Sequence, residues 1–144
     1  MLKTRLQHPE ILAALAGAGH GMKVLIADLN YPFAMAAPPN GKLVYLNLCP
    51  GKPSVTEVLD LIAEAVPIEA LEHVVPPDGS TPQIVSEFRA ILGPDVPFTA
   101  HDRFGFYAAV RAAIDSHQLC LTVATGEERI YSNALVTIGY IPPG

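Results

Sequence analysis

Apolar residues recur at every third or fourth position in four segments of this chain, the spacing that places them on one face of a helix. The pattern predicts helices over His8–Ala18, after Ser54, over Thr81–Leu92 and after Asp102. Between these segments, short apolar runs bounded by turn residues predict strands. The predicted strands are Lys23–Asp28, Leu43–Leu48, Ile68–Val75, Pro97–Ala100, Leu119–Thr125 and Ala134–Tyr140.

Three of the predicted helices begin at residues whose side chains can accept hydrogen bonds from free backbone N–H groups. Ser54 and Glu57 have the three-residue spacing of a capping box. Thr81 is the predicted cap of the next helix, with Pro82 at its first position. Asp102 is the predicted cap of the last helix.

Strands that alternate with helices are typical of the α/β class, with a single central sheet flanked by helices. The last two predicted strands have no helix between them, so they form either an antiparallel pair or part of a mixed sheet. The 144 residues contain no linker and no repeat, and this length suits one domain. We therefore predict a single domain over residues 1–144, a three-layer-like α/β fold with a central mixed sheet. Within it, we expect His73 on an exposed strand position.

Composition adds an expectation about assembly and partners. Only 16% of the residues are charged and half are hydrophobic, which is little charge for the surface of a small monomer. Subunit interfaces would cover the excess apolar surface, so we expect a homo-oligomer. The net charge is −5 and the nine Lys and Arg are scattered, which argues against nucleic acid and anionic membranes as partners. The irregular loop Asn30–Gly41 is predicted to be functional or to lie at a subunit contact.

Cysteine usage and the absence of targeting patterns favour a cytoplasmic protein. Cys49 and Cys120 lie far apart without metal-type spacing, and Cys120 sits in an apolar strand where a small buried hydrophobe is expected. No apolar run reaches the length of a transmembrane helix, and the first residues do not form a signal peptide pattern.

Several motifs that carry common chemistries are missing from the sequence. There is no phosphate-binding Gly-rich loop, no dinucleotide fingerprint after the first strand, no nucleophile elbow and no His or Cys pair with zinc spacing. The sequence therefore gives no support for phosphoryl transfer, dinucleotide redox chemistry or metal-dependent hydrolysis. We expect neither a cofactor nor a metal.

Four polar features remain, and each lies next to a predicted strand end. They are His20 between Gly19 and Gly21, Asp28, the triplet His101-Asp102-Arg103, and the triplet Tyr131-Ser132-Asn133. A histidine can give and take a proton near neutral pH. By residue type alone, these features fit a surface turn, a helix cap and the start of a strand as well as they fit a functional site.

The order and spacing of these features resemble the D-ribose pyranase and L-fucose mutarotase family (the RbsD/FucU type) over nearly the whole chain. The matching pieces are Met1-Leu2-Lys3, Pro9-Glu10-Ile11-Leu12, Gly19-His20-Gly21, Asp28 with Pro32 beyond it, Arg103-Phe104-Gly105-Phe106-Tyr107, and Thr125-Gly126-Glu127 followed by Tyr131-Ser132-Asn133. The resemblance implies an RbsD-like fold and a sugar site.

The resemblance also implies roles for individual residues. His20 corresponds to the proton donor, and Asp28 to a sugar-binding aspartate that also belongs to the catalytic pair. Arg103 corresponds to a sugar contact of the fucose branch, which places this chain closer to L-fucose mutarotases. The substrate-binding segment falls on Tyr131, Ser132 and Asn133.

Two departures from the family pattern bear on the choice of sugar. Ser132 stands where glycine or alanine is usual, and Asn30-Tyr31 stands where the fucose branch has a histidine-containing stretch.

The implied reaction is the interconversion of sugar ring forms by proton transfer, with His20 moving the proton and Asp28 orienting it or holding a hydroxyl. Two alternatives remain open: a non-catalytic monosaccharide-binding or regulatory protein, and an isomerase or lyase acting on another small carbonyl compound. The family resemblance further implies rings of five subunits, stacked as decamers, with sites near subunit contacts.

Overall fold

The computed structural model describes residues 1–144, and these form four α-helices, one 3-10 helix and six strands. The elements in chain order are α1 (Pro9–Ala16), β1 (Lys23–Ala27), η1 (Phe33–Ala36), β2 (Lys42–Tyr45), α2 (Val55–Ala65), β3 (Ile68–Val74), α3 (Gln83–Leu92), β4 (Phe98–His101), α4 (Arg103–Asp115), β5 (Leu119–Ala124) and β6 (Ala134–Ile138). The predicted helices and strands are all present, with ends shifted by a few residues.

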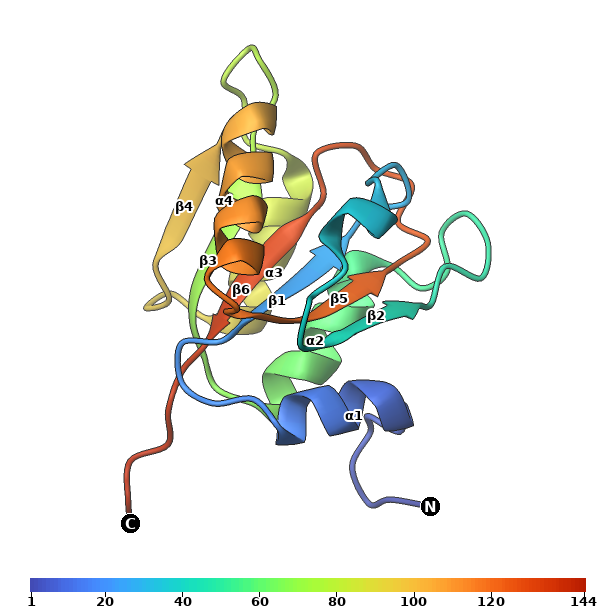
Figure 1. Ribbon diagram of the computed structural model, residues 1–144. Coiled ribbons are helices and arrows are strands. Elements are labelled where there is room, and N and C mark those ends of the chain that lie inside the picture. Colours follow the sequence, from blue (N-terminus) through green and yellow to red (C-terminus); the bar gives the residue numbers. More distant parts are fainter.

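The six strands form one mixed sheet in the order β2-β5-β1-β6-β3-β4 (Figure 1). β1 pairs in parallel with β5, and β3 with β4, whereas β6 runs antiparallel to both of its neighbours, β1 and β3. The last two strands of the chain are therefore not a hairpin, because β1 lies between them. This resolves the open alternative in favour of the mixed sheet.

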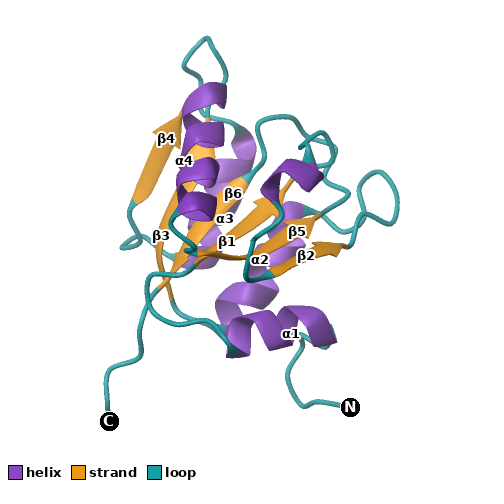
Figure 2. Cartoon of the chain, in the orientation of Figure 1, coloured by secondary structure: helices purple, strands orange, loops and turns teal.

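Helices cover both faces of the sheet and give the fold its three layers (Figure 2). On one face, α1, α2 and α3 pack their apolar sides onto the sheet, with Ile11, Leu59 and Phe88 almost fully buried. On the other face, α4 and η1 pack with Phe106 and Val110 in a second, smaller cluster. Only one α-helix covers this second face, which leaves room beside α4 at the edge of the sheet.

The predicted helix starts are confirmed at two positions and wrong at the third. Ser54 and Glu57 form the complete capping box of α2, and the Asp102 side chain accepts a hydrogen bond from the Gly105 N–H at the start of α4. Thr81 does not cap α3, because the helix begins at Gln83 and its N-cap is Pro82, which has extended backbone angles and no side-chain acceptor.

His73 is buried, contrary to the prediction of an exposed position. Only 6% of its surface is accessible, because β3 lies inside the sheet between β6 and β4 and its ring packs edge-on against Phe98. Burial lowers the pKa of His73, so the imidazole is a neutral packing group.

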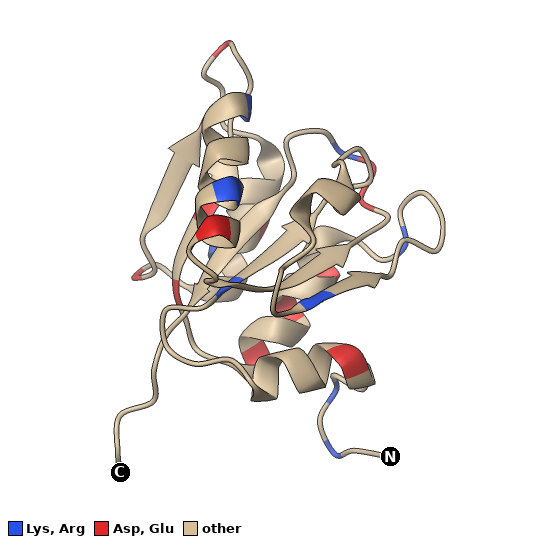
Figure 3. Ribbon diagram, in the orientation of Figure 1, with Lys and Arg blue, Asp and Glu red and all other residues tan.

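Charges are sparse and intermixed on the molecule, with acidic and basic positions interspersed and no basic face in this view (Figure 3). No helix combines the length and the apolar character that a membrane crossing requires.

Candidate functional site

The reversed direction of β6 brings together segments that lie far apart in the sequence. Asp28 follows the end of β1, and Asn133 precedes the start of β6. Because β6 is antiparallel to β1, the start of β6 lies beside the end of β1. An edge of the sheet here means the side at which the strands end, and not an outer strand. The ends of β3 and β4 reach this edge as well, and Arg103 begins α4 directly beyond it. The carboxyl edge of an α/β sheet is the usual position for a ligand site.

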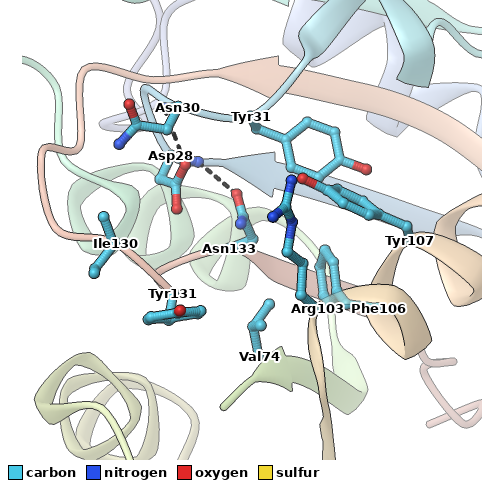
Figure 4. Close-up of a pocket in the computed structure, with 10 residues that line it drawn as sticks. All are labelled: Asp28, Asn30, Tyr31, Val74, Arg103, Phe106, Tyr107, Ile130, Tyr131 and Asn133. Atoms are coloured by element: carbon cyan, nitrogen blue, oxygen red, sulfur yellow. Dashed lines mark hydrogen bonds between the residues drawn. The ribbon is translucent and has the colours of Figure 1, made fainter. Parts of the chain in front are cut away.

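A cavity of about 260 Å³ opens at this edge (Figure 4). It is lined by Asp28, Asn30, Tyr31, Val74, Arg103, Phe106, Tyr107, Ile130, Tyr131 and Asn133. Four of the predicted site residues, namely Asp28, Arg103, Tyr131 and Asn133, thus meet in one place. They come from three segments of the chain.

Asp28 is the structural centre of the cavity wall. Its side chain accepts hydrogen bonds from the backbone N–H groups of Asn30, at 3.1 Å, and Ser132, at 3.3 Å. Burial raises the pKa of this carboxyl, and the backbone hydrogen bonds oppose that rise without cancelling it. Asp28 therefore joins the loop after β1 to the segment before β6 and keeps a partly desolvated carboxylate at the cavity.

Asn133 completes the same connection from the other side. Its Oδ1 accepts a 2.7 Å hydrogen bond from the Asp28 N–H. This bond fixes the orientation of the amide and leaves the Nδ2 group, which donates to no protein atom, as a donor at the cavity (Figure 4).

Ser132 contributes its backbone rather than its side chain. The residue is 1% exposed, and its hydroxyl donates to the carbonyl of Ile130. The predicted substrate residue Ser132 therefore lies beneath the cavity wall, where its N–H holds Asp28.

Tyr131 lines the cavity in a conformation that is unusual for a tyrosine. Its φ of 56° lies in the left-handed region, which costs a residue with a side chain about 1–3 kcal/mol and persists only where the surroundings hold it. Strain of this kind is concentrated at functional sites.

Aromatic rings form the opposite wall, and the sequence did not single them out as site residues. Tyr31 packs edge-on against Phe106 and Tyr107, with ring centroids 6.4 Å and 5.5 Å apart. The Arg103 guanidinium lies 5.7 Å from the centre of the Tyr107 ring and pairs with no carboxylate of the chain. Burial raises the pKa of the Tyr31 hydroxyl, which therefore remains a hydrogen-bond donor. The helical spacing of Phe106 and Tyr107, three and four residues after Arg103, is the signal that could have identified this wall.

His20 lies at the opposite edge of the sheet from Asp28. Seven residues separate it from Asp28, namely Gly21, Met22 and the five residues of β1. At about 3.3 Å per residue, β1 alone spans about 16 Å. Its Nε2 lies 2.8 Å from the Glu69 carboxylate, its ring lies 5.2 Å from that of Tyr140, and about half of its side chain is exposed. Within one chain, Asp28 therefore does not orient His20, and Glu69 occupies that position.

The cavity can hold a small neutral molecule that carries several hydroxyl groups. It offers a carboxylate that accepts hydrogen bonds, an amide and a guanidinium that donate them, and aromatic faces that can cover C–H groups. No group of three His, Cys, Asp or Glu side chains is arranged to hold a metal ion.

Known proteins resemble this chain in sequence and in fold. A fucose mutarotase from Danio rerio is 29% identical over 147 residues, covering 94% of this chain and 90% of the relative. A D-ribose pyranase from Bacillus cereus is 29% identical over 144 residues, covering 98% and 99%. The crystal structure of the fucose mutarotase from Streptococcus pneumoniae in complex with L-fucose is 28% identical, covers 94% of each chain and superposes with a TM-score of 0.74.

The family model described as the RbsD / FucU transport protein family matches residues 1–141. This match spans every helix and strand, including both segments that meet at Asp28. The chain belongs to the RbsD / FucU transport protein family.

Proposed function

We propose that this protein is a monosaccharide mutarotase, an isomerase that interconverts the ring forms of a sugar. The observation that carries the proposal is the cavity at the edge of the sheet, where Asp28, Asn133 and Arg103 converge opposite an aromatic wall. Relatives with the names fucose mutarotase and D-ribose pyranase support the same reaction class.

The reaction needs proton transfers together with reversible cleavage of the bond between the anomeric carbon and the ring oxygen. The anomeric hydroxyl loses a proton while the ring oxygen gains one, and the hemiacetal opens to the free aldehyde. The aldehyde rotates and closes again on its other face or through another hydroxyl. In the proposed site, Asp28 accepts a hydrogen bond from a sugar hydroxyl, and Asn133 and Arg103 donate to sugar oxygens. A positioned acid–base group contributes about 10²–10⁴-fold to such a step.

His20 is the proposed proton donor, and its position argues for a site shared between subunits. His20 lies before the start of β1, whereas Asp28 and the cavity lie beyond its end, and about half of the His20 side chain is exposed. A His20 side chain from a second copy, docked at the mouth of the cavity, would complete the acid–base set. Exposed apolar residues provide a surface for such a contact. Ile130 lines the cavity itself, and Phe104 and Met35 line a neighbouring hollow that shares Arg103 with it. We propose a closed ring, with five or ten subunits as the first sizes to test.

Mixed oligomers test the shared site directly. His20→Ala subunits and Asp28→Asn subunits would each be inactive alone. After joint refolding of equal amounts, about a quarter of the sites in a ring would combine an intact His20 with an intact Asp28 from different chains. Recovery of activity supports the shared site. No recovery in rings shown to be mixed contradicts it, and a monomeric mass by light scattering contradicts the ring itself.

L-fucose is the first sugar to test, and D-ribose the second. Arg103 favours the fucose branch by the resemblance, and the apolar side chains of Val74, Phe106 and Ile130 offer contacts for the methyl group of a 6-deoxy sugar. Saturation-transfer NMR on fucose, ribose and galactose would measure the exchange between anomers. Exchange that rises with protein concentration supports the mutarotase, whereas sugar binding without faster exchange would indicate a binding or regulatory protein instead.

The proposed location is the cytoplasm. The two cysteines are free thiols, one exposed and one buried, and free thiols suit a reducing compartment. Fractionation of cells producing the untagged protein would test this proposal.

A further inference from the structure

The segment that carries Tyr131 is fixed at one end by an arginine outside the cavity. The Arg129 side chain donates from Nε and Nη2 to the two carboxylate oxygens of Glu127, at 2.9 Å and 3.0 Å. The Arg129 backbone N–H donates to the same carboxylate at 3.2 Å. Its Nη1 also pairs with Glu87 on α3. A bidentate (two-pronged) ion pair of this kind fixes the orientation of the guanidinium as well as its distance from the carboxylate.

Glu127 is itself held rigidly, which makes it an effective anchor. It is 4% exposed, and its carboxylate also accepts a hydrogen bond from the Val55 N–H at the start of α2. Its backbone carbonyl accepts a hydrogen bond from the N–H of Leu29, the residue that follows Asp28. The anchor is therefore connected both to a helix and to the loop that forms the other side of the cavity.

Two cavity residues lie between this anchor and the next fixed point of the chain. Ile130 and Tyr131 follow Arg129 directly, and both line the cavity. The next fixed residue is Ser132, whose N–H donates to Asp28. Tyr131 has a left-handed backbone, so its ring direction depends on attachment at both ends.

We propose that Arg129 is a positioning residue for the ligand cavity: through Glu127 and Glu87 it fixes the backbone that aims Ile130 and Tyr131 at the ligand. Arg129 is not among the residues that line the cavity. The inference rests on the proposed function only in taking a sugar as the ligand.

The first test is sugar affinity in Arg129→Gln. The glutamine keeps a polar side chain but loses the charge and the two-pronged contact. With folding verified by circular dichroism, we expect the dissociation constant for L-fucose to rise about tenfold, as when one hydrogen-bonding contact is lost, with kcat for exchange within about twofold. Arg129→Lys, which restores the charge but not the fork, should recover part of the affinity. An unchanged dissociation constant, or a loss confined to kcat, would overturn the proposal.

Arg5→Gln is the matched control. Arg5 also pairs with two carboxylates, Asp60 and Glu64 on α2, and it lies outside the cavity. We expect its substitution to change the dissociation constant less than twofold. An equal loss of affinity in this control would show that any broken arginine pair has the same effect, and would overturn a specific role for Arg129.

A second readout requires no sugar and separates this inference from the mutarotase proposal. The Ile130 methyl resonance, observed by ¹³C methyl NMR, should shift or broaden in Arg129→Gln, while the resonance of the buried Ile11 should not. An unchanged Ile130 resonance overturns the positioning role, even if the protein is a mutarotase. If the wild type binds none of the sugars, the function proposal fails and this readout still decides the role of Arg129. If Arg129→Gln does not fold, Arg129→Lys is measured in the same way.

Discussion

Replacing Asn133 by alanine should weaken both the fold and the site, because one hydrogen bond serves both. Asn133 Oδ1 accepts the Asp28 N–H at 2.7 Å, and Asp28 is 3% exposed. The alanine variant leaves this N–H buried without an acceptor, which costs about 1–3 kcal/mol. For a domain of this size, the thermal midpoint should fall by about 3–10 °C.

The same substitution removes the Nδ2 donor from the cavity. Loss of one neutral hydrogen bond to a sugar oxygen weakens binding by about 3–10-fold. Urea denaturation gives the change in unfolding free energy, and NMR titration with L-fucose gives the change in affinity.

Asn30→Ala is the matched control for Asn133→Ala. Asn30 also lines the cavity, but it is exposed and contacts Asp28 through its backbone N–H, which alanine retains. We expect its unfolding free energy to stay within about 0.5 kcal/mol of the wild type. Equal unfolding free energies for the two variants would refute the reasoning, since the bond from the Asp28 N–H would then carry no stability.

Three further predictions follow from burial and charge. Because burial raises the pKa of Asp28, folding disfavours its ionised form, so the unfolding free energy of the wild type should rise relative to that of Asp28→Asn as the pH falls from 7 to about 3. Asparagine has one acceptor oxygen for the two N–H groups of Asn30 and Ser132, so the variant loses one of these bonds at every pH, and it should also abolish sugar exchange. Burial alone would raise the pKa of Glu127, but hydrogen bonds and charge from Arg129 outweigh burial and lower this pKa. The stability that Glu127 contributes is therefore present at pH 7 and is lost as the pH falls through its folded-state pKa. The difference in urea midpoint between wild type and Glu127→Gln should accordingly shrink in acid. Phe88→Ala should cost about 3–5 kcal/mol in urea denaturation and leave L-fucose affinity unchanged, because Phe88 is fully buried on the sheet face away from α4.

The local pattern was sufficient for most elements of the fold, because each depends on nearby residues. The capping box at Ser54 and the cap at Asp102 are short-range hydrogen bonds that residue types predict well. The prediction that Thr81 caps α3 was wrong because Pro82 occupies the N-cap position, and this proline shifts the start of the helix to Gln83. The prediction that His73 is exposed was wrong because the burial of a strand residue depends on its neighbours in the sheet. For His73 these neighbours are β4 and β6, which lie far from it in sequence.

The site depends on pairing between distant strands, which periodicity does not contain. His20 and Asp28 are eight residues apart in the sequence, yet a strand places them at opposite edges of the sheet. Asp28 and Asn133 are 105 residues apart and hydrogen-bonded, because β6 is antiparallel to β1. The left-handed Tyr131 could not be predicted from its residue type, since tyrosine seldom adopts that backbone and is held there by tertiary contacts.

The most direct test of the central claim is saturation-transfer NMR of L-fucose with wild type, His20→Ala and Asp28→Asn protein. The account predicts that the exchange rate between anomers rises in proportion to wild-type concentration. It also predicts that both variants, folded by circular dichroism, leave the exchange at the rate of buffer alone. Wild-type protein that binds the sugar without faster exchange, or folded His20→Ala protein that retains the wild-type rate, would contradict it.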